Sequence, residues 1–398
     1  MDVKKQVNVV KNKQNNNQNI NKNNQKEEEN KKIEELDQHI QKRFSINKIV
    51  GKGAYGVVFK ATDKKTNELI ALKKLYDGFR NETDSQRTFR EVMLLQELNG
   101  HENIIRLLNV IKAENNMDLY LVFEYMEADL YNVIKANILQ DIHKRFVIYQ
   151  ICKALKFIHS ADIVHRDLKP SNVFINSDCT VKLGDFGLAR TLLSSKKGFD
   201  PIVTDYVATR WYRAPEMILG SSSYSKNVDM WSVGCILMEM LNRKPLFPGK
   251  STKEQIKLVF EVIGFPNKEE FNKVKNKLEF QVNYEYLSKE FKDIIKKGIK
   301  QVLNQNGVNA PPECIDFLKG LLTFDPEKRM TVDEALKHPY LSSFHSEEEE
   351  YICDRIISLP LDDNKRYEVD KYRKTLYDEV MKRKIEIRNK LLEGLKKK

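Results

Sequence analysis

One stretch near the middle of the chain is the most informative, because it combines a carboxylate, an ammonium group and an amide within eight residues. It reads His165-Arg166-Asp167-Leu168-Lys169-Pro170-Ser171-Asn172. Asp167 offers an oxygen that can accept the proton of a hydroxyl group, and Lys169 adds a positive charge two residues later. Asn172 supplies an amide oxygen, a ligand suited to a hard cation such as Mg²⁺. The spacing predicts one loop that carries proton-accepting and metal-binding groups together.

Two further motifs follow this stretch and enclose a pair of hydroxyl groups. Asp185-Phe186-Gly187 begins the segment and Ala214-Pro215-Glu216 ends it. Between them, Thr204-Asp205-Tyr206 places two hydroxyl groups one residue apart. A phosphate on either hydroxyl adds up to about two negative charges, which can order a loop through contacts with arginines. The pair predicts a switch with two inputs.

A glycine-rich turn and a lysine lie upstream of these motifs. The turn is Gly51-Lys52-Gly53-Ala54-Tyr55-Gly56-Val57-Val58, whose glycines let backbone N–H groups approach phosphates without a side-chain clash. A dinucleotide-binding turn would open a helix, whereas residues typical of a strand follow here. Ile70-Ala71-Leu72-Lys73 then places a lysine in a second strand-like run. Together they predict a site for the phosphates of a nucleotide.

These motifs, in this order and at this spacing, resemble those of the protein kinases. The run Tyr206-Val207-Ala208-Thr209-Arg210-Trp211-Tyr212-Arg213 resembles the mitogen-activated protein (MAP) kinases, a family that can be matched from about Phe44 to Tyr377. Within it, residues 121–130, 138–149 and 219–224 are most similar to the atypical branch of extracellular-signal-regulated kinases numbered seven and eight. The chain carries Asp205 where animal members have Glu, and it lacks the long tail of that branch.

This resemblance implies an α+β fold, the bilobal eukaryotic protein kinase fold, with a small β-rich N-lobe and a larger helical C-lobe. The hydrophobic pattern agrees with it. β-Branched residues dominate up to Phe123, interrupted by one amphipathic helix at about Thr88–Leu98, and helical periodicity begins at Leu130. A short helical pattern leads into a first strand at Phe44, and a last helix is expected from about Val369.

The expected domains are a disordered Asn/Lys-rich tail with a short lead-in at 1–43, a protein kinase domain at 44–344 and a charged C-terminal extension at 345–398. The kinase domain divides into an N-lobe at 44–126 and a C-lobe at 127–344, with an insert of the MAP kinase type at about 264–310. The first segment is predicted to be disordered because its asparagines and lysines supply too little apolar surface to offset the entropy lost on ordering.

The resemblance implies an enzyme that transfers the γ-phosphoryl group of ATP to serine or threonine of protein substrates, with Ser/Thr-Pro sites expected. ATP and Mg²⁺ are the expected cofactors. Phosphorylation of Thr204 and Tyr206, by another kinase or by the enzyme itself, is expected to switch the activity on. Two alternatives stay open: a cyclin-dependent-like kinase, which would need a partner subunit, and a kinase-fold scaffold. An inactive scaffold predicts the loss of a catalytic side chain, and Lys73, Asp167, Asn172 and Asp185 are all present.

Catalytic roles for single residues are implied by the same resemblance. Asp167 would orient the substrate hydroxyl and accept its proton, while Lys169 would neutralise charge on the transferred group. Lys73 would hold the α- and β-phosphates and pair with Glu91 on the following helix.

The remaining nucleotide and metal contacts are implied in the same way. Asn172 and Asp185 would hold Mg²⁺. The nucleotide is expected to contact Val50, Gly51, Lys52, Gly53, Ala54, Tyr55, Gly56, Val58, Ala71, Lys73, Glu124, Met126 and Asp129. Phe123 would close the pocket behind the adenine.

Phosphate on Thr204 would need guanidinium partners. The candidates are Arg87, Arg90, Arg166 and Arg190, which would tie the helix bearing Glu91 to the catalytic loop. Arg210 and Arg213 resemble the residues that bind phosphotyrosine at position 206. Any single arginine could equally form an ordinary surface ion pair. Arg329 is expected to have a structural role, because it resembles the arginine that pairs with the glutamate of Ala-Pro-Glu, here Glu216.

An acidic cluster follows the last helical pattern and consists of Glu347, Glu348, Glu349, Glu350 and Asp354. In MAP kinases a cluster at this place docks basic motifs of partner proteins, whereas a run of glutamates is as often a solvated face. Docking-motif partners are therefore one of two interpretations. The protein is expected to act as a monomer.

The composition excludes several other classes of protein. The 398 residues carry a formal net charge of +11, much of it in the tails, so nucleic acid is an unlikely partner. Five scattered cysteines without a C-x-x-C pair argue against a zinc site or a disulfide framework. No run approaches the roughly 18 apolar residues that span a bilayer, and the N-terminus lacks the apolar core of a signal peptide. We therefore expect no transmembrane segment and a cytoplasmic or nuclear location.

Overall fold

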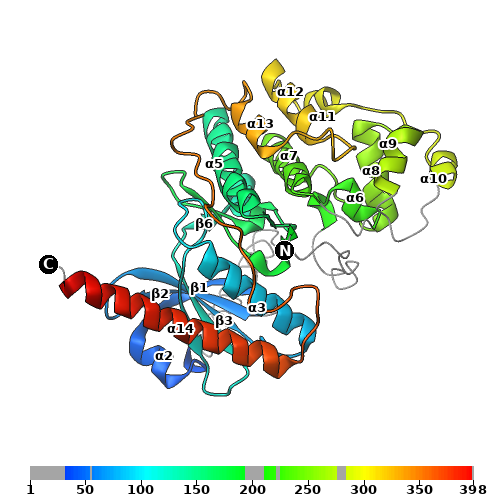
Figure 1. Cartoon of the computed structure of the whole chain (residues 1–398). Coiled ribbons are helices and arrows are strands. Elements are labelled where there is room, and N and C mark those ends of the chain that lie inside the picture. Colours follow the sequence, from blue (N-terminus) through cyan, green and yellow to red (C-terminus); the bar gives the residue numbers. More distant parts are fainter. Residues whose placement is uncertain (1–31, 54–55, 193–209, 221–224, 276–283, 397–398) are drawn as a thin grey trace, which may run out of the picture. The chain divides into compact units, whose positions relative to one another are not determined.

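The computed structural model describes residues 32–53, 56–192, 210–220, 225–275 and 284–396 (Figure 1). These residues fall into two compact units. One comprises the chain up to Gly78 together with Leu107–Tyr125, and the other comprises Phe79–Arg106 together with the chain from Met126 onward. The first unit is mostly β-sheet and the second is mostly helical, which confirms the α+β fold with one β-rich and one helical part.

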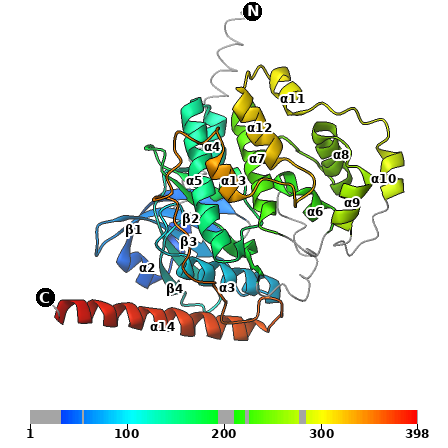
Figure 2. The same cartoon turned by 45° about the horizontal axis from the view of Figure 1, so that its top comes forward.

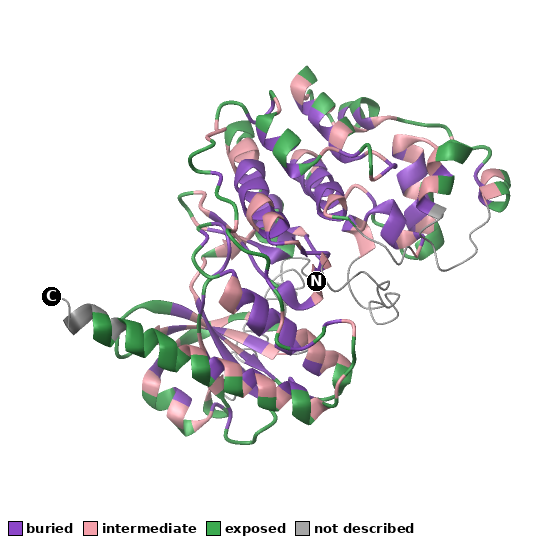
Figure 3. Cartoon of the chain, in the orientation of Figure 1, coloured by how far each residue is buried: buried purple, intermediate pink, exposed green. Residues whose placement is uncertain are grey.

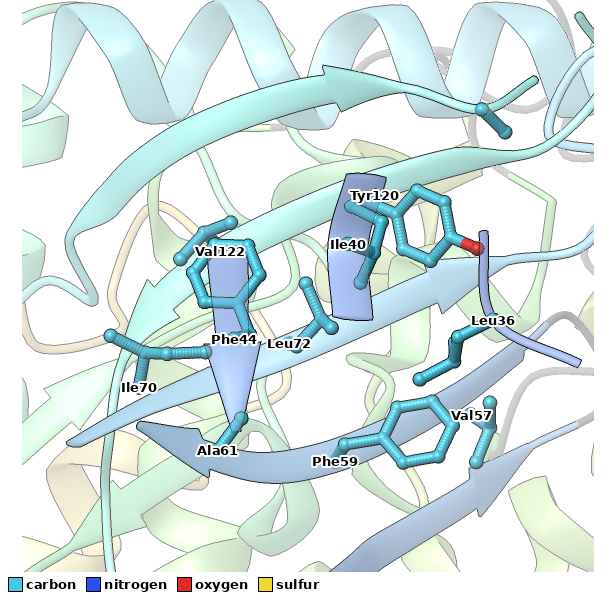
Figure 4. Close-up of a cluster of buried hydrophobic side chains, with 11 residues drawn as sticks. Leu36, Ile40, Phe44, Val57, Phe59, Ala61, Ile70, Leu72, Tyr120 and Val122 are labelled. Carbon is cyan, nitrogen blue, oxygen red and sulfur yellow. The ribbon is translucent and has the colours of Figure 1, made fainter. Parts of the chain in front are cut away.

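The first unit is built on one antiparallel sheet with the strand order β1-β2-β3-β5-β4. Its elements are α2 (Gln38–Arg43), β1 (Phe44–Gly53), β2 (Gly56–Asp63), β3 (Leu69–Leu75), β4 (Leu107–Lys112) and β5 (Leu119–Glu124). The buried cluster includes Ile40 of α2, Phe59 of β2, Ile70 and Leu72 of β3 and Val122 of β5 (Figure 4). Because side chains alternate along a strand, Ala71 and Lys73 belong to the opposite face of β3.

The second unit carries most of the helices. Its first helices are α3 (Glu82–Glu97), α4 (Leu130–Ala136), α5 (Asp141–Ser160), α6 (Pro215–Ile218) and α7 (Asn227–Asn242). They are followed by α8 (Thr252–Ile263), α9 (Lys268–Lys275), α10 (Tyr284–Glu290), α11 (Ile299–Gln305), α12 (Pro312–Leu321), α13 (Val332–Lys337) and α14 (Val369–Lys396). Helices α5 and α7 form the core of this unit, since both are buried along most of their length (Figure 3).

Short strands and 3₁₀ turns of the second unit carry the sequence motifs. Their bounds are β6 (Ala128–Asp129), β7 (Ile163–Val164), η1 (Pro170–Asn172), β8 (Val173–Ile175), β9 (Val181–Leu183), η2 (Phe186–Leu188), β10 (Arg190–Thr191) and η4 (Arg210–Tyr212). The strands form two small sheets, β6-β8-β9 and β10-β7. These sheets fix where the loop after β7 and the turn after β9 begin and end.

Helix α3 is longer than the sequence predicts. It begins at Glu82, six residues before the expected start at Thr88. The reason is an N-terminal cap: the side-chain oxygen of Asn81 accepts a hydrogen bond from the backbone N–H of Asp84 at 2.9 Å. The acidic side chains of Glu82 and Asp84 also lie in the first turn, where the helix dipole favours negative charge. The added turns belong to the same unit as the catalytic loop.

The C-terminal extension ends in a helix that begins at Val369, as the sequence predicts. Helix α14 runs along α3 in both views of the chain (Figure 2). The first strand likewise begins at the predicted Phe44. Within the described ranges, no helix combines the length and the apolar character that crossing a bilayer requires.

Candidate active site

The loop between β7 and η1 has a backbone conformation that its sequence alone would not favour. Arg166 lies in the left-handed region with φ of 67°, and Asp185, in the turn after β9, has φ of 59°. Such angles are uncommon for residues that carry a Cβ atom, so surrounding contacts must hold them. These two positions mark the loop and the turn that carry the predicted catalytic and metal-binding side chains.

Asp229 provides much of that support from the first turn of α7. Its carboxylate is fully buried and accepts hydrogen bonds from the backbone N–H groups of His165 and Arg166, both at 2.8 Å. It also lies 2.9 Å from Nε2 of His159. Burial acts to raise the pKa of the Asp229 carboxyl, but the hydrogen bond and charge of His159 outweigh it and hold this pKa below its ordinary value. A buried carboxylate thus fixes the turn immediately before Asp167.

Asp167 lies at the centre of the loop, and three predicted residues meet there. Its Oδ2 accepts hydrogen bonds from Nζ of Lys169 at 2.5 Å and from Nδ2 of Asn172 at 3.1 Å. Burial raises the pKa of the Asp167 carboxyl; the Lys169 ammonium opposes this effect and the Asp185 carboxylate adds to it, so the pKa lies above its ordinary value. A carboxylate with a raised pKa is a better proton acceptor than an ordinary aspartate.

The turn that carries Asp185 is joined to this loop by backbone contacts. The N–H of Gly184 donates to the carbonyl oxygen of Asn172 at 3.0 Å, and Nε2 of His165 lies 3.0 Å from the carbonyl oxygen of Gly184. The ring of Phe186 is fully buried and packs 4.9 Å from the ring of His165. The loop and the turn therefore form one bonded structure, which places Asn172 and Asp185 on neighbouring segments.

The donor set of Asn172 and Asp185 suits a hard cation. The amide nitrogen of Asn172 donates hydrogen bonds to the carbonyl oxygen of Asp167 at 2.8 Å and to the Asp167 carboxylate. The amide oxygen of Asn172 is therefore the atom left to bind a metal ion. Mg²⁺ is commonly bound by one or two protein oxygens together with substrate phosphates. The residues present therefore fit Mg²⁺ brought with a nucleotide.

The first unit presents the glycine-rich hairpin and Lys73 on adjacent strands. Gly51 pairs with Val58 across β1 and β2, and Val58 pairs with Lys73 across β2 and β3. Gly56 is required by close packing as well, because a Cβ atom there would overlap the carbonyl oxygen of Lys74. Ala54 and Tyr55, which separate β1 from β2 in the sequence, lie outside the described residues.

Lys73 and its neighbour Lys74 have different environments. Lys74 is buried; its Nζ lies 3.4 Å from Asp118 and over the rings of Tyr76 and Tyr120. Lys73 is half-buried on the opposite face of β3, the face that also carries Ala71. The side chain of Lys74 is thus engaged within its own unit, and Lys73 stays the lysine predicted to bind phosphates. The pairing of Lys73 with Glu91, which belongs to the other unit, also stays a prediction.

The other nucleotide-contact candidates are distributed over both units. Val50, Lys52 and Gly53 lie on exposed parts of β1, and Phe123 is buried on β5 opposite Ala71. Glu124 is the last residue of β5, and Met126 is the residue at which the chain returns to the second unit. Asp129 caps α4: its carboxylate accepts from the backbone N–H of Asn132 at 2.9 Å and from the Asn132 amide at 2.7 Å. Their contacts with adenine or ribose stay predictions.

The arginines predicted to receive phosphate do not share one environment. Thr204 and Tyr206 lie outside the described residues. Arg90 is fully buried in α3 and forms a two-point ion pair with Asp363, at 2.7 Å between Nη2 and Oδ1. Arg190 lies 3.6 Å from the same carboxylate. Arg166 donates to the carbonyl oxygen of Leu188 at 3.2 Å, Arg210 donates to that of Lys250, and Arg87 and Arg213 are half-buried.

The structural pairing of Arg329 with Glu216 is confirmed. Nη1 and Nη2 of Arg329 lie 2.8 and 2.9 Å from the two carboxylate oxygens, and both side chains are almost fully buried. The guanidinium also lies over the ring of Trp231. This pair ties α6 to the segment before α13.

The acidic cluster is only partly exposed. Glu350 is buried and paired with Lys156 at 3.2 Å and with His345 at 2.6 Å. Glu349 lies 3.8 Å from Lys153, and Glu347 and Glu348 are exposed. Asp354 is exposed as well. Glu350 therefore has a structural role, and only the other four carboxylates face solvent.

Two important carboxylates were absent from the sequence prediction of the site. Asp229 was not predicted as a site residue, although an aspartate followed by Met230 and Trp231 in an apolar helix indicates a buried acid that needs donors. Asp363 lies almost 200 residues after the catalytic loop in a charged segment. No local pattern distinguishes it from its neighbour Asp362.

Comparison with known proteins agrees with this geometry. The protein kinase domain family matches residues 44–341. The chain is 49% identical over 359 residues to extracellular signal-regulated kinase 2 of Dictyostelium discoideum, covering 90% of this chain and 95% of that protein. It is 50% identical to mitogen-activated protein kinase 15 of Xenopus laevis and 47% identical to extracellular signal-regulated kinase 7 of Drosophila melanogaster. The chain spans 61% and 38% of the lengths of these two proteins.

Proposed function

Because this chain belongs to the protein kinase family and, within it, to the MAP kinases, which are serine/threonine kinases that use ATP, we propose that it phosphorylates Ser/Thr-Pro sites and is switched on by phosphorylation of Thr204 and Tyr206. The observation that carries the chemistry is the buried Asp167 carboxylate, bonded to Lys169 and Asn172 beside the turn that bears Asp185. The MAP kinase relatives favour this function over a cyclin-dependent-like kinase, which would require a partner subunit.

The side chains of the loop divide the reaction between them. Asp167 orients the substrate hydroxyl and accepts its proton as the oxygen attacks the γ-phosphorus and the bond to the leaving β-phosphate oxygen breaks. Lys169 neutralises charge on the phosphoryl group during transfer. Asn172 and Asp185 would hold Mg²⁺, which when bound neutralises charge on the phosphate oxygens. Because the transition state of phosphoryl transfer is loose, no covalent catalyst is needed. Catalysis then depends on positioning the reacting groups and on neutralising the charge of the phosphate oxygens.

Replacement of Asp167 tests the proposed chemistry. Asp167→Asn removes the proton acceptor and is expected to lower kcat by about 10²–10⁴-fold. The measurement is transfer of labelled γ-phosphate from ATP–Mg²⁺ to a Ser-Pro peptide, with a Ser-Ala peptide as the specificity control. Asp293→Asn is the matched control, since Asp293 is an exposed aspartate far along the sequence. An Asp167→Asn enzyme as fast as the wild type would remove the proposed mechanism.

The switch is tested separately. Thr204→Ala combined with Tyr206→Phe is expected to lower kcat at least about tenfold, because neither hydroxyl can then carry phosphate to its arginines. Mass mapping of protein made in bacteria decides how the switch is set. Phosphate on both residues in the wild type, but not in Lys73→Arg, indicates self-phosphorylation. Full activity of the double variant would show that the switch does not exist.

Partner docking and location complete the proposal. Glu347, Glu348 and Asp354 are the exposed carboxylates to which basic docking motifs would bind, while the buried Glu350 supports the segment. A protein with substrates of this kind would work in the cytoplasm or the nucleus. Charge reversal at Glu347 and Glu348 should weaken binding of a basic docking peptide, whereas reversal at the exposed Glu386 of α14 should not.

A further inference from the structure

The carboxylate of Asp363, in the C-terminal extension, binds Arg90 of α3, one of the arginines predicted to bind phosphothreonine. Asp363 is 4% exposed, and both of its oxygens accept hydrogen bonds from Arg90, at 3.0 Å from Nε to Oδ1, 3.2 Å from Nε to Oδ2 and 2.7 Å from Nη2 to Oδ1. Arg90 itself is 1% exposed. Two-point pairs between arginine and carboxylate are among the strongest hydrogen-bonded contacts, and they reproduce the way arginine binds phosphate.

More than one of the predicted phosphate-binding arginines faces this carboxylate. Nε of Arg190 lies 3.6 Å from Oδ2 of Asp363. Burial acts to raise the pKa of the Asp363 carboxyl, but the charges of Arg90, Arg190 and Arg166 outweigh it and hold this pKa below its ordinary value. Asp363 is therefore an anion at neutral pH. Three of the four arginines predicted to bind phosphothreonine thus stabilise the negative charge of an aspartate in the chain itself.

The same contact joins the C-terminal extension to α3 and to the turn that carries Asp185. Nη1 of Arg90 donates to the carbonyl oxygen of Gly187 at 2.7 Å, in the turn that carries Asp185. Arg90 directly precedes Glu91 on α3. Gln86, one helical turn earlier, donates from Nε2 to the backbone oxygen of Asp363 at 3.1 Å. The extension, α3 and the metal-binding turn are thus linked through one guanidinium group.

Side-chain packing further along the extension supports this link. The ring of Tyr372 packs 5.7 Å from the ring of Phe89, and Leu376 of α14 is fully buried. Arg383 of α14 and Arg355 both pair with Glu97 at the end of α3, at 2.9 and 2.6 Å. The segment from Asp363 to Arg383 therefore follows α3 along its length (Figure 2).

We propose that Asp363 is a positioning residue for phosphoryl transfer, whose carboxylate gives Arg90 and Arg190 the negative partner that phosphate would otherwise provide. It thereby holds α3 and the metal-binding turn in place before any phosphate is added. Without this partner, Arg90 would be a buried charge with only a neutral oxygen to bind, and such a charge is strongly unfavourable. The proposal rests on the kinase activity and on the phosphorylation switch proposed above.

The test compares matched variants of the full-length protein. Asp363→Asn keeps the size of the side chain and removes its charge, Asp363→Glu keeps the charge, and Asp362→Asn makes the same change at the exposed neighbour. Each protein is assayed with ATP–Mg²⁺ and a Ser-Pro peptide after phosphatase treatment, and again when phosphorylated on Thr204 and Tyr206. Mass mapping verifies both states.

We expect the unphosphorylated Asp363→Asn enzyme to lose about tenfold in kcat, with a smaller change in KM for ATP. Asp363→Glu should stay within about threefold of the wild type, and Asp362→Asn should be unchanged. In the phosphorylated state, Asp363→Asn should recover to within about threefold, because the added phosphate supplies the missing negative charge. The ratio of phosphorylated to unphosphorylated activity therefore rises in this variant.

Two results would overturn the proposal: an unchanged kcat in unphosphorylated Asp363→Asn, or an equal fall in both phosphorylation states. If Asp363→Asn does not fold, Arg90→Lys tests the same contact, since it keeps one positive charge and loses the two-point geometry. Because Arg90 is also predicted to bind the added phosphate, the deciding measurement in this variant is the unphosphorylated enzyme: kcat is expected to fall about tenfold, and an unchanged kcat counts against the proposal. A wild-type enzyme that transfers no phosphate would instead contradict the proposed function.

Discussion

At the scale of single residues, buried carboxylates decide the geometry of this molecule. Asp229, Asp363 and Glu216 each satisfy donors that come from a different part of the chain. Each is almost fully buried, so its partners cannot be replaced by water. The backbone conformation of the catalytic loop therefore depends on an acid in α7, more than 60 residues further along the sequence.

Replacement of Asp229 should cost stability as well as activity. Asp229→Asn leaves one acceptor oxygen for three donors and turns an N–H₂ group toward backbone N–H groups, so we expect the free energy of unfolding to fall by about 3 kcal/mol. Urea unfolding followed by circular dichroism measures this loss. Asp316→Asn, at a mostly exposed aspartate near His338, should change stability by less than about 0.5 kcal/mol. A loss below about 1 kcal/mol for Asp229→Asn would show that the turn is held by other contacts.

At the scale of elements, the position of α3 is set by contacts on both of its sides. The carbonyl oxygen of Gly187 accepts a hydrogen bond from Arg90, and α14 packs along the helix, with the ring of Tyr372 against that of Phe89. Arg329 plays a comparable part for α6, which it joins to the following helices through Glu216. Both helices are thus held by ion pairs with segments that lie far away in the sequence.

Truncation of Leu376 should loosen α14. Leu376 is a fully buried residue of α14, which packs along α3, so Leu376→Ala leaves a cavity there and is expected to lower the free energy of unfolding by about 2–5 kcal/mol. Hydrogen exchange should show earlier exchange in both α14 and α3. Ile385→Ala is the matched control, because Ile385 lies on the same helix and is 54% exposed. Equal exchange in the two variants would mean that α14 does not stabilise α3.

At the scale of the whole molecule, the titrating carboxyl groups predict how stability depends on pH. The pKa values of Asp63, Asp178, Asp229, Glu334 and Asp363 lie below their ordinary values in the folded protein. Each contributes stability that is present above its unfolded pKa of about 4 and is lost as the pH falls through its folded pKa. Asp167 and Glu239 have raised pKa values and act in the opposite direction.

We therefore expect the urea midpoint to be highest near neutral pH and to fall as the pH is lowered from about 5 toward 2.5. Asp363→Asn should flatten this decline, because one of the two most deeply buried carboxylates with a lowered pKa is then absent. Asp362→Asn should leave the decline unchanged. The measurement is the urea midpoint at four pH values between 6 and 3. A midpoint that stays constant over this range would contradict the electrostatic account.

Most of the fold and much of the catalytic loop could be predicted from the sequence. The strand-like run Ile70-Ala71-Leu72-Lys73 is confirmed as part of β3, and the spacing from Asp167 to Asn172 predicted a loop whose side chains meet. The start of α3 was wrong by six residues, because the cap at Asn81 outweighs the weak periodicity that follows it. The predicted docking cluster included Glu350, which the structure shows to be buried and paired with Lys156 and His345. The sequence does not reveal these partners, because they come together only in the folded chain.

The chemical groups and their local order can be read from the amino-acid sequence, because the alternation along a strand and the spacing within a loop act over a few residues. The sequence placed Arg90 among the residues that bind phosphate, but only the tertiary structure gave that arginine its partner. Asp362 and Asp363 are adjacent identical residues, one exposed and one buried against two arginines. Which of them binds is decided by where the extension meets α3, since electrostatic energy depends on distance and burial and not on position along the chain.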